Sequence, residues 1–182
     1  MYACRTPNVR EEELHCACTA LGIEPPILLD YQDGHLAEAN LETIVSEILA
    51  VMADLHPQVM FTFGPDGLSG HLDHIAIGKF ATEAFNRSNY VNALYTLALP
   101  QSLVDALGMA HIHALPDKAI TLAVDVSETW EAKMKAIHCH ATQLSSSSIT
   151  LAPPERQRLF LGKEHFVCVA KREGRDFLFD YL

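Results

Sequence analysis

The stretch from Leu41 to Phe63 reads LETIVSEILAVMADLHPQVMFTF and decides the fold class. Up to Leu55 its apolar side chains recur at i, i+3, i+4, i+7 and i+8, which is the spacing of one helix face. Pro57 then ends the pattern because proline cannot continue a helix. The run from Val59 to Phe63 lacks polar alternation, which is typical of a strand covered by helices on both faces. This stretch predicts a helix followed by a buried strand.

The same alternation of helices and strands continues on both sides of this stretch. Expected strands lie at Ile27–Leu29, Ala93–Leu99, Ala119–Val126 and Phe166–Ala170. Expected helices lie at Val9–Leu21 with Asn8 as its N-cap, from His71 onward, and at Gln101–Leu107, Ser127–His140 and Glu155–Leu161. Helices that alternate with apolar strands imply a mainly parallel sheet. We therefore predict one α/β domain over residues 1–182, with a mostly parallel sheet flanked by helices.

The composition narrows the class of partner. The chain has 182 residues, 13 Lys plus Arg and 23 Asp plus Glu, so its formal net charge is −10. Such a surface repels nucleic-acid phosphates and anionic lipid, so we expect neither nucleic acid nor membrane as a partner. No apolar run of membrane-spanning length occurs, which predicts a cytoplasmic protein. The five cysteines are scattered and odd in number, which favours reduced thiols over a disulfide framework.

One dense polar cluster follows the predicted strand. The loop Gly64–Gly70 leads into His71, Asp73 and His74, at a strand-to-helix junction. Ligands of parallel sheets bind beyond the carboxyl ends of strands, so this is where we expect a site. Histidines three apart share a helix face and neutral imidazole is a good zinc ligand. A capped helix start with solvated histidines fits the same residues equally well.

Other histidines offer weaker signals. His111 and His113 could chelate a metal if their segment were extended, although Gly108–Pro116 has the composition of a connecting loop. His138 and His140 are two apart in an expected helix, where their side chains diverge. No nucleophile-elbow or P-loop pattern occurs, so neither a serine hydrolase nor a nucleotide-binding protein is indicated.

Four stretches together resemble a known family. They are Arg10 to Ile23, Leu29 to Gly34, Gly70 to His74, and Val124 to Gln143. The first is similar to the Arg-x-x-Glu helix that ends in Leu-Gly-Ile in the LmbE/PIG-L zinc-dependent N-deacetylases, and the second to their Leu-x-Asp-x-x-Asp-Gly segment. The third resembles their His-Pro-Asp-His motif, and the fourth their Val-Asp-Val-Ser to His-x-Ser-Gln block. The order of the four matches is that of the family.

The resemblance implies a Rossmann-like hydrolase that removes an N-acyl group from a small amino-sugar-like substrate. By this resemblance His74 would be a zinc ligand, and His71 would protonate the leaving amine or stabilise the oxyanion. Asp73 would tune that pair. Zinc lowers the pKa of bound water to about 7 and polarises an amide carbonyl, which suits this reaction.

The resemblance also implies substrate contacts. Arg10 and Asp33 match positions near the substrate pocket, where a guanidinium and a carboxylate can bind sugar hydroxyls or a phosphate. His140 matches the family block and would reach the pocket rim; an ordinary helix-end histidine is the alternative. The acyl acceptor itself stays open between sugar, thiol-conjugate and peptide-antibiotic substrates.

One family motif is missing from this sequence. Family members open with a strand that carries Ala-His-Pro-Asp-Asp-Glu, which supplies two zinc ligands and the general base, and nothing before Arg10 resembles it. The resemblance therefore implies N-terminal truncation, loss of a central strand and exposed strand edges, which favour a homo-oligomer. A misplaced start, a degenerate gene, or a second chain that completes the site would each explain this. The competing function is a non-catalytic relative that binds a sugar-like ligand or a partner without metal.

Overall fold

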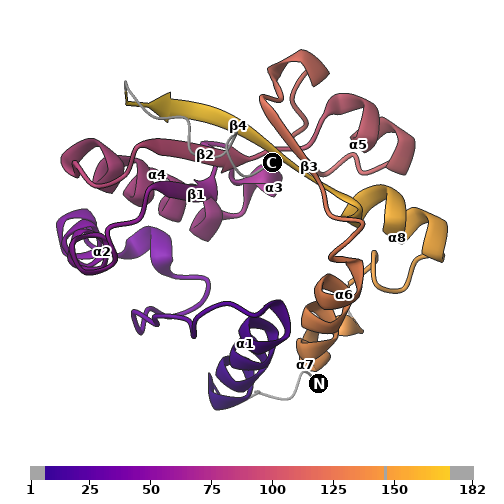
Figure 1. The fold of residues 1–182 in the computed structure, drawn as a ribbon, viewed down its shortest axis with the longest axis horizontal. Coiled ribbons are helices and arrows are strands. Elements are labelled where there is room, and N and C mark those ends of the chain that lie inside the picture. The colour runs from indigo at the N-terminus through magenta and orange to yellow at the C-terminus, as the bar shows by residue number, and fades with distance from the viewer. Residues whose placement is uncertain (1–6, 146, 173–182) are drawn as a thin grey trace. The chain divides into compact units, whose positions relative to one another are not determined.

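The computed structural model describes residues 7–145 and 147–172 (Figure 1). The strands are β1 (Val59–Phe63), β2 (Ala93–Leu97), β3 (Leu122–Asp125) and β4 (Lys163–Lys171). The α-helices are α1 (Pro7–Leu21), α2 (Leu41–Leu55), α3 (Gly67–Gly70), α4 (Leu72–Arg87), α5 (Gln101–Leu107), α6 (Trp130–Cys139), α7 (Ala141–Leu144) and α8 (Pro154–Leu161). Two short 3-10 helices, η1 (Leu36–Glu38) and η2 (Asp117–Ala119), complete the elements.

The helix and strand predicted between Leu41 and Phe63 are both confirmed. Helix α2 begins after Asn40, whose side chain accepts a hydrogen bond from the Thr43 backbone N–H at 3.1 Å. It ends at His56, which takes a left-handed conformation with φ of 48° directly before Pro57. The local sequence therefore sets both ends of this element.

Two local predictions were wrong. Helix α1 starts at Pro7, so Asn8 lies inside the helix rather than at its N-cap; proline is favoured in the first turn, where its missing N–H costs nothing. The segment Ile27–Leu29 forms no strand, and the side chains of Ile27 and Leu28 are 57% and 42% exposed. An apolar run predicts a strand only when a neighbouring strand is there to pair with it.

The α/β class is confirmed, and the sheet is more mixed than the sequence indicated. Its strand order is β1-β2-β4-β3. Strand β1 pairs with β2 in parallel, with Val59 opposite Ala93, whereas β2 pairs with β4 antiparallel, with Leu97 opposite Phe166. An apolar run shows that a strand is buried but carries no information on its direction, which explains why the reversed last strand was not foreseen.

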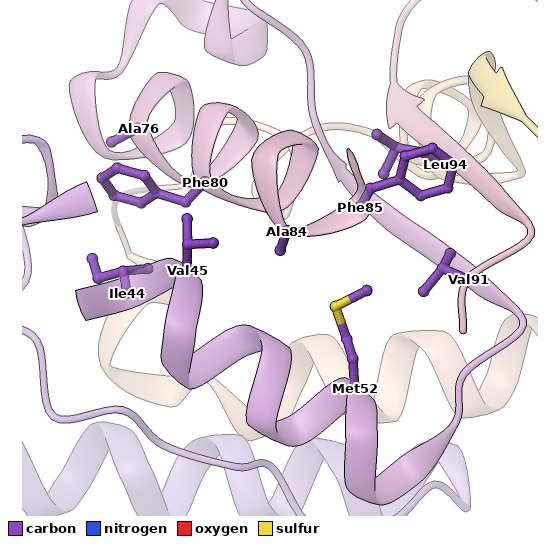
Figure 2. Close-up of a cluster of buried hydrophobic side chains, with 9 residues drawn as sticks. All are labelled: Ile44, Val45, Met52, Ala76, Phe80, Ala84, Phe85, Val91 and Leu94. Carbon is purple, nitrogen blue, oxygen red and sulfur yellow. The ribbon is translucent and has the colours of Figure 1, made fainter. Parts of the chain in front are cut away.

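The hydrophobic core lies between α2, α4 and the start of β2. It consists of Ile44, Val45, Met52, Ala76, Phe80, Ala84, Phe85, Val91 and Leu94. Figure 2 shows the α4 side chains facing those of α2 across this cluster. Gly78 belongs to the same packing, because a Cβ there would lie 2.5 Å from the Phe63 carbonyl oxygen. Glycine thus lets α4 approach the end of β1 closely.

The described residues group into two compact units. The first comprises residues up to 28 together with 124–164, and the second comprises residues 29–123 together with those from 165 onward. The core cluster of Figure 2 belongs wholly to the second unit. The single domain predicted for residues 1–182 stays a prediction.

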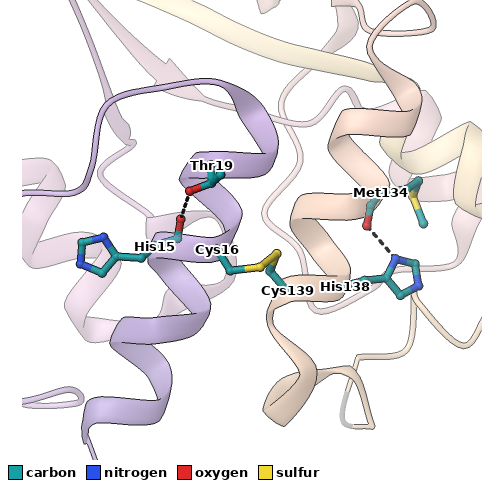
Figure 3. Close-up of a disulfide and its surroundings, with 6 residues drawn as sticks. All are labelled: His15, Cys16, Thr19, Met134, His138 and Cys139. Carbon is teal, nitrogen blue, oxygen red and sulfur yellow. Dashed lines mark hydrogen bonds between the residues drawn. A yellow bond between two sulfur atoms is a disulfide. The ribbon is translucent and has the colours of Figure 1, made fainter.

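The first unit contains a disulfide that the sequence did not predict. Cys16 of α1 and Cys139 of α6 are bonded, 123 residues apart in the chain. Figure 3 shows the bond bridging the two helices, with His15 and His138 on their outer sides. Cys18 and Cys168 are free thiols as expected, and Cys4 lies outside the described residues. The expectation of reduced thiols was therefore wrong for the Cys16–Cys139 pair, because a count of cysteines does not show which helices pack together.

None of the helices in the described ranges has both the length and the apolar character needed to cross a membrane. The cytoplasmic location stays a prediction. The Cys16–Cys139 disulfide argues against this prediction, because disulfides are rare in reducing compartments such as the cytoplasm.

Candidate functional site

The turn between β1 and α4 shapes the candidate site. After Phe63 the chain passes through Gly67 and Leu68, whose φ values are 62° and 65°. A Cβ on Gly67 would lie 2.9 Å from Cγ1 of Ile75, so only glycine fits this approach. The Asp66 carboxylate accepts the Leu68 backbone N–H at 2.9 Å and supports the turn. The turn places the start of α4 at the carboxyl end of β1.

His74 is held tightly in the first turn of α4. Its Nδ1 lies 3.1 Å from the carbonyl oxygen of Gly67, and its ring stacks on Phe63 with centroids 3.9 Å apart and planes 9° from parallel. A carbonyl oxygen can only accept, so this hydrogen bond assigns the ring proton to Nδ1. The lone pair of Nε2 is then free, as a metal ligand requires.

His71 has the opposite arrangement. It is the N-cap residue of α4, and its Nδ1 accepts a hydrogen bond from the Asp73 backbone N–H at 3.2 Å. That bond uses the lone pair of Nδ1, so the proton of the neutral ring lies on Nε2. The centroids of the His71 and His74 rings are 4.7 Å apart. Two neighbouring imidazoles thus offer one N–H donor and one free lone pair.

Asp73 connects two segments of the chain. One carboxylate oxygen accepts the Gly34 backbone N–H at 2.6 Å, and the other accepts the Leu36 backbone N–H at 3.0 Å. No hydrogen bond joins this carboxylate to either imidazole among the described residues. Asp73 therefore holds the segment that carries the exposed Asp33 against the start of α4.

The other two predicted site residues belong to the first unit. Nη2 of Arg10 donates to Oε1 of Gln143 at 3.2 Å, and the Gln143 backbone N–H donates to the His140 carbonyl at 2.9 Å. The structure thus brings Arg10 and His140 together through Gln143. It separately brings together the second-unit residues, which are Asp33, His71, Asp73 and His74.

Glu13, a buried residue of α1 near Arg10 in sequence, hydrogen-bonds to the stretch Val124 to Gln143 that resembles the family. Its two carboxylate oxygens accept the Thr142 backbone N–H at 2.6 Å and the Thr142 hydroxyl at 2.7 Å. Glu13 is only 7% exposed. Its charge is compensated by these hydrogen bonds, which fix α7 to α1.

Two residues near the histidine pair were missed by sequence reasoning. Phe63 was predicted only as the last residue of a buried strand, whereas its ring covers one face of His74. His113 was considered only as a partner of His111 in a metal site, but its backbone N–H donates to the Leu68 carbonyl at 2.8 Å, beside the turn. Gly108–Pro116 is a loop as predicted, without a strand. No periodic pattern marks either contact, because both arise from chain segments that meet only in the fold.

Comparisons with known proteins identify a family model and several relatives. The family described as PIG-L: GlcNAc-PI de-N-acetylase matches residues 2–85. A protein of Mycobacteroides abscessus is 30% identical over 90% of this chain and 71% of its own length, and one of Mycobacterium sp. (strain KMS) is 28% identical over 95% and 67%. Both are named 1D-myo-inositol 2-acetamido-2-deoxy-alpha-D-glucopyranoside deacetylase.

A solved structure shares the fold. It is a conserved protein of Thermus thermophilus with a TM-score of 0.64 and 20% identity, matched over 94% of this chain and 80% of that one. The chain spans about two thirds of the length of the relatives named above. The similarity in sequence across most of the chain, including the turn that carries His71 and His74, shows that the chain belongs to the PIG-L/LmbE deacetylase family.

Proposed function

We propose that this protein removes the acetyl group from an N-acetylated amino sugar. The observation that carries the proposal is the pair formed by His71 and His74 at the carboxyl end of β1, in which one ring presents an N–H and the other a lone pair. The names of the relatives, which are deacetylases of an acetamido sugar linked to inositol, support an amino-sugar substrate.

His71 suits the stabilisation of an oxyanion better than the donation of a proton as an imidazolium ion. Its Nδ1 already accepts the Asp73 N–H, and protonation of Nδ1 would turn that attraction into a clash of two N–H groups. A neutral ring with its proton on Nε2 can instead donate to the carbonyl oxygen as negative charge develops there.

Asp33 and Arg10 are the proposed substrate-binding groups. Asp33 is exposed, and the hydrogen bonds of Asp73 to the adjacent Gly34 hold its segment beside α4. A carboxylate accepts from sugar hydroxyls, whereas the Arg10 guanidinium donates to hydroxyl or phosphate oxygens. His140 is proposed to lie at the rim, since its backbone is tied to Gln143, the residue that Arg10 contacts.

Zinc is the proposed cofactor, and the described residues supply only part of its site. Nε2 of His74 fits as one ligand, but a catalytic zinc ion takes three protein ligands. Within residues 7–145 and 147–172 no three His, Cys, Asp or Glu side chains are grouped so that they could hold a metal ion. We propose that a second chain supplies the remaining ligands.

This incomplete ligand set also favours the second candidate function. In that case the protein binds a sugar-like ligand or a partner without metal, and Asp33, Arg10 and the histidine pair act only as recognition groups. The two functions differ in one measurable product, since only the deacetylase releases acetate.

The direct test measures acetate released from the acetamido sugar–inositol conjugate by the wild type, His71→Ala and His74→Ala. We expect turnover by the wild type, and a loss of about 100-fold or more in kcat for His71→Ala, the range for loss of an oxyanion donor. We expect no turnover by His74→Ala. Lys118→Ala, at an exposed residue remote in sequence from the histidine pair, serves as the matched surface control.

Binding of the conjugate without acetate release, at added zinc, would contradict the deacetylase and favour the recognition protein. Equal turnover of the wild type and His71→Ala would contradict the role of His71.

A further inference from the structure

His113 lies against the loop that carries His71. Its backbone N–H donates to the carbonyl of Leu68, and its ring carbon Cε1 lies 3.7 Å from where a Cβ on Gly70 would be. Gly70 has a φ of 76° and directly precedes His71. The imidazole of His113 is therefore next to the start of α4, at the site described above.

The segment that carries His113 is also fixed to the other strand of the parallel pair. The Leu115 N–H donates to the Leu99 carbonyl at 2.9 Å, and the Leu115 carbonyl accepts the Gln101 N–H at 2.8 Å. Leu99 follows β2 by two residues. Since β1 and β2 are parallel, their carboxyl ends share one edge of the sheet, which is where ligands of such sheets bind.

Among the described residues, none hydrogen-bonds to the ring nitrogens of His113, and His113 forms no three-residue metal-binding group with His71 and His74. A neutral imidazole offers one donor and one acceptor, which is the combination that a hydroxyl group can satisfy on both sides. Its chemistry therefore fits a polyol better than a metal ion.

We propose that His113 binds a hydroxyl group of the sugar and is a specificity-determining residue of this site. The proposal rests on the proposed deacetylase function and deepens it, because it assigns different parts of the substrate to different residues of the site. His71 and His74 act at the amide, whereas His113 contacts the polyhydroxylated part of the substrate. An amide without hydroxyl groups gains nothing from His113.

The test compares the wild type with His113→Ala on two amides, N-acetylglucosamine and N-acetylcyclohexylamine. Loss of one hydrogen bond should raise KM for the sugar by about ten-fold and leave kcat within about two-fold. KM for the hydroxyl-free amide should change by less than about two-fold. His113→Gln, whose amide retains a donor and an acceptor, should recover part of the loss.

His111→Ala is the matched control, because His111 is an exposed residue of the same loop, two positions away. It should behave as the wild type on both amides. An unchanged KM for the sugar in His113→Ala, or an equal loss on both amides, would overturn the proposal.

A binding measurement separates this proposal from the proposed function. N-acetylglucosamine is titrated into the zinc-free proteins, and Kd is obtained from NMR shifts. Weaker binding by about ten-fold in His113→Ala supports the role of His113 even if no variant releases acetate, in which case only the deacetylase function fails. Equal binding by both proteins contradicts the role of His113 alone, and no binding by the wild type contradicts both.

Discussion

Each of the two compact units is stabilised internally by a different kind of interaction. The unit of residues 29–123 contains the apolar cluster of α2 and α4, in which Val45 and Ala84 are fully buried. The unit built from the chain's beginning and residues 124–164 relies on pairs between distant residues, namely the Cys16–Cys139 disulfide and the Glu13–Thr142 hydrogen bonds. The apolar cluster follows from the local periodicity of the sequence. The pairs between distant residues form only because α1 and α6–α7 pack together in the fold.

The candidate site residues are divided between the two units, with Arg10 and His140 in the first and Asp33, His71, Asp73 and His74 in the second. The histidine pair lies at the start of α4, which supplies Ala76, Phe80, Ala84 and Phe85 to the core. The histidine pair of the candidate site is therefore carried by an element of the apolar core. A substitution in one unit should therefore destabilise the elements of that unit before those of the other.

Truncation of the core should have the largest effect. Phe85→Ala removes a side chain that is 5% exposed and should lower the free energy of unfolding by about 3–5 kcal/mol. Chemical denaturation measures this, with hydrogen exchange showing faster opening of α2 and α4. Leu55→Ala, at a side chain that is 59% exposed, should change it by less than about 0.5 kcal/mol. A similar loss in both variants would refute the assignment of the core.

Loss of the disulfide should have the next largest effect. Cys16→Ser opens a closed loop of 123 residues and should cost about 2–4 kcal/mol, with faster exchange in α1 and α6. Cys168→Ser, a change at a free thiol, is the control. Counting of free thiols in the purified protein checks the premise. A count that includes Cys16 and Cys139 would show that the pair is reduced and would support the cytoplasmic prediction.

The smallest expected effect is a pH-dependent loss of stability on substitution of Asp117. The side-chain and backbone hydrogen bonds of Ser102 hold the pKa of Asp117 below its ordinary value of 3.8. A lowered pKa in the folded state adds stability that is present above the ordinary value and is lost as pH falls through the lowered one. Asp117→Asn should therefore be less stable than the wild type by a constant margin from about pH 7 to about pH 5, and the margin should vanish in stronger acid.

The sequence predicted the elements whose signal is local. The helix Leu41–Leu55 and the strand Val59–Phe63 follow from periodicity and Pro57. The candidate site at Gly64–His74, expected from its place after a strand, stays a prediction. The resemblance of the chain to the PIG-L/LmbE family is confirmed by the comparisons.

The sequence did not predict features that depend on distant partners. The strand expected at Ile27–Leu29 lacks a pairing neighbour, the direction of β4 has no local signal, and the Cys16–Cys139 pair requires the packing of α1 against α6. The opposite proton positions of His71 and His74 also escaped prediction. They are set by the backbone groups of Asp73 and Gly67, which only the folded turn brings to the rings.

The zinc content of the purified protein after exhaustive dialysis tests the central claim most directly, namely that His74 is a metal ligand and His71 is not. The account predicts about one zinc per chain for the wild type and for His71→Ala, and none for His74→Ala. Equal zinc content in the wild type and His74→Ala, or no zinc in the wild type, would contradict it.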